Sequence, residues 1–266
     1  MKLAVIIPAA GSSQRFNAGV DDALARRSKL EEDLGGRTVL QRAVELFHTR
    51  PETEAIIVAG PHDAEAMNAF KFRHADTLAL LGATIVAGGK THRWETVRAA
   101  MDAVPASATH IAVHDAARPA CPASVIDRVL DAARRHAAVI PVIEIDSTVK
   151  RLGDVVADDE PDPLASILGS QDKAPLRAVG ETVDRSGLVL VQTPQVFERS
   201  LLERAYAQDD LSSTDDAGLV ERLGERVVCV AGDPRNIKIT RPDDLEMVRR
   251  LANFRGPGEK PAYLRF

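Results

Sequence analysis

The sequence predicts an α/β fold with a mostly parallel, Rossmann-like twisted sheet flanked by helices, and three observations support this. Apolar runs recur along the 266 residues, beginning with residues 3–7, and such runs are typical of strands buried on both faces. Segments with helical spacing of apolar residues separate the runs, which indicates right-handed parallel crossovers. Small, hydroxyl-bearing or charged residues follow several runs, and ligands bind at such strand ends in an open sheet.

The predicted elements alternate along most of the chain. Apolar runs predict strands at residues 3–7, 55–59, 83–87, 109–114, 137–145, 188–192 and 226–231. Helical spacing predicts helices over residues 63–73, 124–136 and 197–207, and others that begin after Thr38, near Arg93, after the capping sequence Ser213–Asp216 and at Pro242.

The alternation breaks at residues 146–187. This segment has no periodic helix and contains the acidic, proline-containing stretch DDEPDP at residues 158–163. A long segment without clear elements is usually functional or disordered rather than packed core, so we expect a protruding arm or lid, with residues 158–174 its most mobile part. The rest of residues 1–252 then forms a single domain, followed by a loosely ordered tail at 253–266.

Composition excludes several classes of function. The net charge is −5 and no basic stretch stands out, which argues against nucleic acid as a partner. No apolar run suits a signal peptide or a membrane span. Cys121 and Cys229 form neither a metal-binding nor a redox pattern, so we expect two reduced thiols in a cytoplasmic protein.

The first strand leads into a candidate phosphate loop that ends at Arg15. Ala9–Gly11 carry almost no side chain, so an anion can approach the backbone N–H groups closely. Two serines add hydroxyl donors, and Arg15 adds a planar guanidinium suited to phosphate oxygens. By itself this stretch is equally compatible with an ordinary strand-to-loop exit, because it matches neither of the commonest nucleotide-binding glycine patterns.

Other strand ends carry further charge and backbone donors. Gly88–Gly89 precede Arg93 at a predicted helix start, where anions are favoured. Asp115 follows a predicted strand, a favoured place for a metal ligand in an open sheet. Lys238 stands among apolar neighbours, which favours an anion contact over a surface lysine that snorkels to water.

One edge of the predicted sheet would therefore be strongly basic. It would carry Arg15, Lys29, Arg93, Arg118, Arg185 and Lys238 against a single metal-type carboxylate, Asp115. On a chain of net charge −5, such an edge indicates a polyanionic ligand. No Ser–His–Asp, Cys–His or paired-carboxylate pattern supports hydrolase chemistry. Cations, backbone donors and one metal site are what phosphoryl or nucleotidyl transfer requires.

At this point the chain resembles the 2-C-methyl-D-erythritol 4-phosphate cytidylyltransferases of the non-mevalonate isoprenoid pathway. The resemblance runs from Leu3 to about Leu251. Its motifs are PAAG with Arg15, GG with Arg93 and Thr96-Val97, HDAARP at 114–119, Thr148-Val149-Lys150, TVDR at 182–185, TPQ at 193–195, TDDA at 214–217 and NIKITRPDDL at 236–245. HDAARP together with TVDR, TPQ and NIKIT is specific, whereas PAAG alone indicates only the wider nucleotidyltransferase fold.

The resemblance implies a fold of the nucleotide-diphospho-sugar transferase type and a reaction of CTP with 2-C-methyl-D-erythritol 4-phosphate, assisted by Mg²⁺. The products would be 4-diphosphocytidyl-2-C-methyl-D-erythritol and pyrophosphate. The implied catalytic residues are Arg15, Lys29 and Lys238. The implied nucleotide-binding residues are Pro8, Ala9, Ala10, Gly11, Ser12, Gly88, Gly89, Arg93, Thr96, Asp115 and Ala116, with Asp115 also the metal ligand. The implied acceptor-binding residues are Arg118, Thr148, Arg185, Thr193 and Thr214.

The arm has its own role in this resemblance. In the family it crosses to the partner subunit, and it carries Thr148 and Arg185 here. The resemblance therefore implies a homodimer with shared active sites, and no nucleic acid or membrane as partner.

The chain departs from the family pattern in the first loop. Ser13 stands where the family has a second glycine, and the interval from Arg15 to Lys29 is longer than usual. Arg26 or Arg27 therefore stays an alternative to Lys29 as the second cation of the loop.

Two other functions stay open on the sequence alone. A cytidylyltransferase for another alcohol phosphate, such as ribitol 5-phosphate, would share most of these motifs. A non-catalytic nucleotide-binding protein could keep the same fold. A dinucleotide oxidoreductase is poorly supported, since its glycine fingerprint and the acidic residue that follows it are missing.

Overall fold

The structure is a computed structural model that describes residues 1–22, 25–156 and 176–252. The acidic stretch expected within residues 158–174 and the tail expected at 253–266 lie outside the described residues. Among the described residues, none of the helices has both the length and the apolar character needed to cross a bilayer.

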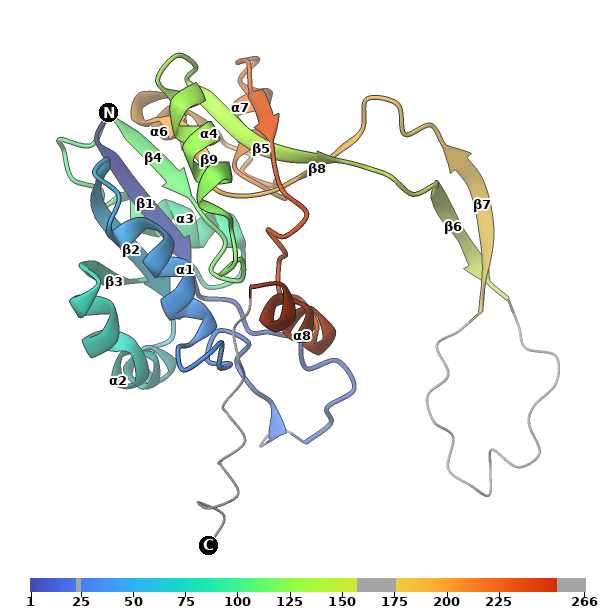
Figure 1. Cartoon of the computed structure of the whole chain (residues 1–266), viewed down its shortest axis with the longest axis horizontal. Helices are drawn as coiled ribbons and strands as arrows, with labels where there is room; N and C mark the ends of the chain where they lie inside the picture. The colour runs from blue at the N-terminus through green and yellow to red at the C-terminus, as the bar shows by residue number, and fades with distance from the viewer. Residues whose placement is uncertain (23–24, 157–175, 253–266) are drawn as a thin grey trace, which may run out of the picture. The chain divides into compact units, whose positions relative to one another are not determined.

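The elements follow one another as strands and helices in alternation over most of the chain (Figure 1). The strands are β1 (Leu3–Pro8), β2 (Thr53–Gly60), β3 (Ala83–Ala87), β4 (His110–Val113), β5 (Ala138–Glu144), β6 (Val149–Val155), β7 (Arg177–Val183), β8 (Val189–Val191), β9 (Gln195–Glu198) and β10 (Val228–Ala231). The helices are α1 (Val39–His48), α2 (Ala64–Leu80), α3 (Arg93–Met101), α4 (Ala123–Ala133), α6 (Arg199–Tyr206), α7 (Ala217–Arg222) and α8 (Pro242–Leu251).

The chain divides into two compact units. The first, called the body here, comprises Met1–Ile143 and Val191–Phe266, and the second, called the arm, is Glu144–Leu190. The arm was expected to lack regular elements, and this was wrong. Strands β6 and β7 pair in antiparallel register, with Val149 opposite Val183.

The central sheet of the body is mostly parallel, as predicted. Its strands run in the order β10-β5-β9-β4-β1-β2-β3. The pairs β1–β2, β1–β4, β2–β3 and β5–β10 are parallel, whereas β9 is antiparallel to both of its neighbours. Strand β9 was not predicted, because its residues were assigned partly to a loop and partly to a helix over 197–207. Its two apolar residues, Val196 and Phe197, are too few for periodicity to separate a strand from a helix start.

Helices cover both faces of this sheet, and the alternation of side chains along β1 explains why. Leu3, Val5 and Ile7 point to the face covered by α1, α2, α4 and α8, and all three are fully buried. Ala4 and Ile6 point to the face covered by α3, α6 and α7, and are equally buried. Because both faces are covered, the strand is a continuous apolar run rather than an alternating one.

Candidate active site

Residues at or just after the carboxyl ends of β1, β3 and β4 line one cavity of about 260 Å³. The loop after β1, the loop after β3, the loop after β4 and the segment before α8 all contribute. The cavity is lined by Pro8, Ala9, Ala10, Gly11, Arg15, Lys29, Leu30, Gly89, Lys90, Thr91, His92, Arg93, Thr96, Asp115, Ala116, Ala117 and Lys238. The three predicted catalytic cations therefore share one cavity with most of the predicted nucleotide-binding residues. Of the residues predicted for the nucleotide, Ser12 and Gly88 are described but do not line it.

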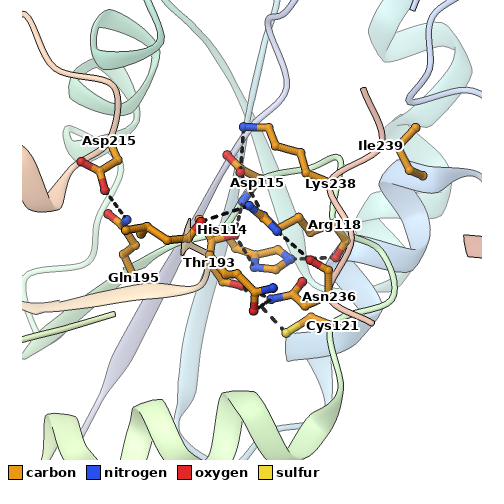
Figure 2. Close-up of polar contacts among 12 residues, drawn as sticks. His114, Asp115, Arg118, Cys121, Thr193, Gln195, Asp215, Asn236, Lys238 and Ile239 are labelled. Atoms are coloured by element: carbon orange, nitrogen blue, oxygen red, sulfur yellow. Dashed lines mark hydrogen bonds and ion pairs between the residues drawn. The ribbon is translucent and has the colours of Figure 1, made fainter. Parts of the chain in front are cut away.

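Asp115 lies at the centre of a cluster of three cations, of which Lys238 and Arg118 are labelled in Figure 2. Its Oδ2 atom is 2.9 Å from Lys238 Nζ and 3.3 Å from Arg118 Nε, and its Oδ1 atom is 3.6 Å from Arg93 Nε. Burial by itself would raise the pKa of Asp115, but Lys238, Arg93 and Arg118 together lower it well below its usual range. The carboxylate is therefore anionic at any working pH, and it fixes the positions of the cations around it.

A second cavity, of about 210 Å³, adjoins this cluster. It is lined by Arg93, Asp115, Arg118, Val191, Thr193, Gln195, Thr214, Asp215 and Lys238. Arg93, Asp115 and Lys238 line both cavities. The predicted acceptor residues Arg118, Thr193 and Thr214 thus gather on the far side of the cluster from the first loop. Ligands in the two cavities would meet at these three charged groups.

Arg93 is itself held by a buried carboxylate. Its Nη2 atom is 2.8 Å from Oδ2 of Asp216, a fully buried side chain, and the Tyr206 hydroxyl donates to the other oxygen of Asp216 at 2.5 Å. Burial acts to lower the pKa of Arg93, but Asp216 and Asp115 outweigh it and raise the pKa. Arg93 therefore remains charged and bridges two carboxylates.

Asp216 does not act as the helix cap that the sequence suggested. It occupies the N-cap position of α7 without a side-chain capping bond, whereas Asp215 Oδ1 accepts from the backbone N–H of Gly218 at 3.0 Å. The neighbouring Asp215 satisfies the helix start, and Asp216 is free to point into the core toward Arg93. The capping interpretation of Asp216 was therefore wrong, because the side chain that caps α7 is that of Asp215.

Lys29 lies in the first cavity, whereas Arg26 and Arg27 do not. Lys29 Nζ donates to the carbonyl of Ile239 at 2.7 Å, while Arg27 pairs with Glu32 and Arg26 Nε donates to the carbonyl of Val20. Burial and then the proximity of Lys238 lower the pKa of Lys29 to about 8. Among the three alternatives, Lys29 is the cation that the fold brings beside Lys238.

Ser13 explains how the longer loop holds Lys29. Its backbone has φ of 56°, in the left-handed region that favours glycine. Its side-chain Oγ accepts from the backbone N–H of Lys29 at 3.2 Å. A serine at this position costs backbone strain but supplies a hydrogen bond that glycine could not make, between residues sixteen positions apart in sequence.

The two glycines after β3 serve close packing more than anion binding. A Cβ atom on Gly88 would lie 2.6 Å from the carbonyl of Gly60, and one on Gly89 would lie 2.1 Å from the Cβ atom of Glu95. The N–H of Gly88 donates to Gly60 and that of Gly89 to the Thr96 hydroxyl. These N–H groups are occupied within the protein, so the glycines chiefly let α3 approach the strand end.

Hydrogen bonds hold two residues that line the second cavity, Thr193 and Arg118, in place (Figure 2). The Thr193 hydroxyl oxygen lies 3.0 Å from the backbone nitrogen of Asp115 and 3.2 Å from His114 Nδ1. Asn236 Nδ2 donates to the carbonyl of Thr193 at 2.8 Å, and the carbonyl of Asn236 accepts from Arg118 Nη1 at 2.6 Å. Thr193 and Arg118 are thus tied to one another through a buried asparagine.

Comparisons with known proteins identify the family. The family model for 2-C-methyl-D-erythritol 4-phosphate cytidylyltransferase matches residues 3–171 and 163–252. The chain belongs to this family.

Relatives and solved structures agree with that assignment. The cytidylyltransferase of this name from Rhodococcus jostii is 38% identical over 247 residues, which cover 92% of this chain and 93% of the relative. The one from Symbiobacterium thermophilum is 36% identical and covers 94% of this chain and 92% of its own. The crystal structure of the Thermus thermophilus enzyme is 31% identical, with a TM-score of 0.68, and covers 95% of this chain and 100% of that one.

Not every residue predicted from this family resemblance lies in the body. Thr148 and Arg185 belong to the arm, where Arg185 Nη1 donates to the carbonyl of Ile145 at 2.6 Å. Any contribution of these two residues to an acceptor site therefore depends on the position of the arm.

Three residues at the site were not predicted as part of it. Asn236, Asp216 and Tyr206 are all buried beside predicted residues. Asn236 and Asp216 fall inside the family motifs NIKIT and TDDA, so the motifs could have pointed to them. Tyr206 carries no such signal, because only the fold brings its hydroxyl to Asp216.

Asp115 is also the residue that could hold a metal ion. It is the one carboxylate among the described residues that line the first cavity. The described residues contain no cluster of three or more potential His, Cys, Asp or Glu ligands. Mg²⁺ is usually held by one or two carboxylates together with substrate phosphates and water, so a single carboxylate fits a nucleotide-borne ion.

Proposed function

We propose that this protein transfers the cytidylyl group of CTP to 2-C-methyl-D-erythritol 4-phosphate, releasing pyrophosphate. The observation that carries the proposal is the pair of adjoining cavities that share Arg93, Asp115 and Lys238. The first cavity is lined by the phosphate loop and suits a nucleoside triphosphate. The second cavity suits a small phosphorylated polyol. The names of the relatives in the family supply the identity of both substrates.

The reaction is an in-line displacement at phosphorus. An oxygen of the acceptor's phosphate forms a bond to the α-phosphorus of CTP, while the bond from that phosphorus to the pyrophosphate oxygen breaks. No protein nucleophile is needed, since catalysis rests on positioning and charge stabilisation. In this proposal Lys238 and Lys29, which line the same cavity, neutralise charge that builds on the α-phosphate, and Arg15 stabilises the leaving pyrophosphate.

Asp115 and Arg118 have different tasks in this proposal. Arg118 and Thr193 contact the acceptor, with Thr214 on the same cavity wall. Asp115, the carboxylate that lines both cavities, would hold Mg²⁺ together with the phosphates of the bound nucleotide. When bound, Mg²⁺ supplies charge neutralisation at the triphosphate oxygens.

The proposed function is tested by pyrophosphate release from CTP in the presence of Mg²⁺. We expect release with 2-C-methyl-D-erythritol 4-phosphate and little with ribitol 5-phosphate or without acceptor. Release only with ribitol 5-phosphate would reassign the acceptor. If no alcohol phosphate gives release, the proposed enzymatic function is refuted and the alternative of a non-catalytic nucleotide-binding protein is supported.

A homodimer with exchanged arms is part of the proposal. The arm consists of a two-stranded hairpin that leaves Leu152, Leu176 and Val179 at least 60% exposed in one chain. An isolated two-stranded hairpin is marginally stable in water, so a covering partner of the same kind is favoured. Arg185 and Thr148 would then complete the acceptor site of the partner subunit. The proposed compartment is the cytoplasm, consistent with two unpaired cysteines.

Subunit mixing tests the exchanged arm. Arg15→Ala and Arg185→Ala should each be nearly inactive as homodimers. In a mixed dimer, one site would combine an intact body from one subunit with an intact arm from the other, so activity should return to as much as half of the wild-type value per dimer. If verified mixed dimers stay inactive, the arm does not cross.

A further inference from the structure

The hydroxyl group of Thr193 has two fixed neighbours inside the protein. Its oxygen lies 3.0 Å from the backbone nitrogen of Asp115 and 3.2 Å from Nδ1 of His114. The backbone N–H of Asp115 can only donate, so one lone pair of the Thr193 oxygen is used there. What the hydroxyl hydrogen does depends on whether His114 Nδ1 carries a hydrogen.

The other side of the imidazole ring decides this. His114 Nε2 is 3.1 Å from the carbonyl oxygen of Arg118. A carbonyl oxygen can only accept, so Nε2 must carry the hydrogen of that bond. His114 is fully buried, and its ring contacts the backbone of Arg118, whose side chain is already a cation. Burial of a second positive charge there would be costly. The ring is therefore neutral, and Nδ1 is a bare acceptor.

The orientation of the Thr193 hydroxyl follows from this tautomer. Its hydrogen must donate to His114 Nδ1, because that nitrogen offers only a lone pair. One lone pair of the Thr193 oxygen then remains, and Thr193 lines the second cavity. We propose that His114 is a positioning residue that makes Thr193 a hydrogen-bond acceptor for a hydroxyl group of the polyol phosphate. This inference rests on the function proposed above and names the polarity of its acceptor site.

The other polar residues that line the second cavity also fit a ligand that donates hydrogen bonds and carries a negative charge. Gln195 uses its Nε2 on Asp215 Oδ2 at 2.8 Å and its Oε1 on the backbone N–H of Ala217 at 3.1 Å. Asp215 lines the same cavity and offers carboxylate oxygens as acceptors, and Arg118 and Lys238 line it as cations. The cavity therefore offers acceptors for hydroxyl groups as well as cations for an anion, as a phosphorylated polyol requires.

The imidazole ring is also held rigidly. It packs edge-on against the Phe47 ring, with 5.2 Å between ring centroids and 66° between ring planes. Asn236 holds the carbonyl of Thr193 at 2.8 Å, so the threonine is fixed at both its backbone and its side chain. Such pre-organisation lets the hydroxyl discriminate between ligands by hydrogen-bond polarity instead of rotating to suit them.

Two His114 variants separate the two hydrogen bonds of the ring. His114→Gln can keep a donor near Nε2 but loses the acceptor near Nδ1, and His114→Asn can keep the acceptor and loses the donor. Each is combined with Thr193→Val, and kcat and KM are measured with CTP and 2-C-methyl-D-erythritol 4-phosphate. We expect His114→Gln to raise KM for the acceptor roughly tenfold, as for a lost hydrogen bond, with a smaller change in KM for CTP.

Double-mutant analysis gives the decisive result. If His114 acts through Thr193, His114→Gln adds little to the loss already caused by Thr193→Val, whereas the effect of His114→Asn remains additive with it. Full additivity for His114→Gln would overturn the proposal. Wild-type protein without activity on this acceptor would instead refute the proposed function, so the two failures are distinguishable.

Acceptor analogues carry the test if the His114 variants fail to fold. In each analogue one hydroxyl is replaced by fluorine, which cannot donate a hydrogen bond. The wild-type protein should discriminate about tenfold against one of them, and Thr193→Val should lose that discrimination. A wild-type protein that accepts every fluorinated analogue equally would overturn the proposal, as would Thr193→Val that discriminates like wild type.

Discussion

The phosphate loop and the Asp115 cluster hold their charges in opposite ways. Arg15 is exposed and lies in a loop whose shape depends on backbone conformation at Ser13. Lys238, Arg93 and Arg118 all lie within 3.6 Å of one buried carboxylate. The cluster is therefore arranged by the protein's own ion pairs and needs little reorganisation during reaction, whereas the loop holds its arginine at the exposed surface.

Removal of Lys238 should have the largest effect, because the cluster loses the cation nearest to Asp115. The side chain is 37% exposed, so Lys238→Ala should leave the fold intact. Turnover should fall by about 10²–10³-fold, as for other groups that stabilise charge in the transition state. The measurement is kcat with both substrates saturating, with Lys71→Ala on the exposed face of α2 as the control. Near-normal turnover would remove Lys238 from the site.

Loss of the ion pair between Asp216 and Arg93 should have the next largest effect on activity. Asp216→Asn keeps the shape of the side chain but removes the charge that pairs with Arg93 at 2.8 Å. We expect kcat/KM for CTP to fall about 10–100-fold, because a buried ion pair loses one partner. Tyr206→Phe removes only the hydroxyl donor and should cost less than tenfold. Thermal unfolding of each variant separates a loss of positioning from a loss of fold, and Asp209→Asn serves as an exposed control.

The cluster and the loop also differ in what the sequence could predict. Lys238 was predicted because a cation among apolar residues needs an explanation, and Asp115 because it follows a strand. The role of Asp216 was not predictable, since a carboxylate before a helix looks the same whether it caps the helix or points into the core. Side-chain direction there is decided by the neighbour, Asp215, which takes the cap.

The sheet was more accessible to sequence reasoning than the loop. Parallel buried strands leave continuous apolar runs, and each of the parallel strands of the body was predicted. The antiparallel β9 was missed because its apolar residues are only Val196 and Phe197, between Gln195 and Glu198. The choice of Lys29 over Arg26 and Arg27 depends on contacts with Ser13 and Ile239, far away in sequence. No local pattern encodes such contacts.

The pH dependence of kcat/KM for CTP should distinguish Lys29, which titrates near pH 8, from Arg15. Burial and Lys238 lower the pKa of Lys29 to about 8. The ammonium is therefore present below that pH and lost as the pH rises through it, so kcat/KM for CTP should decline above about pH 8. Lys29→Arg, which stays charged to higher pH, should be less active but should lack this decline. An unchanged alkaline limb in Lys29→Arg would assign the titration to another group.

Substitution of Ser13 should have the smallest effect and measures how the loop is held. Ser13→Ala removes the hydrogen bond to the Lys29 backbone at 3.2 Å but keeps a side chain at φ of 56°. We expect a few-fold rise in KM for CTP and a loss of about 1 kcal/mol in the free energy of unfolding. Ser13→Gly lacks the same hydrogen bond but relieves the left-handed strain, so it should be more stable than Ser13→Ala by about 1 kcal/mol. Chemical denaturation of the two variants compares them directly. Equal stability would mean that the loop relaxes away from the left-handed conformation when the hydroxyl is lost, and that the hydrogen bond to Lys29 is what maintains it.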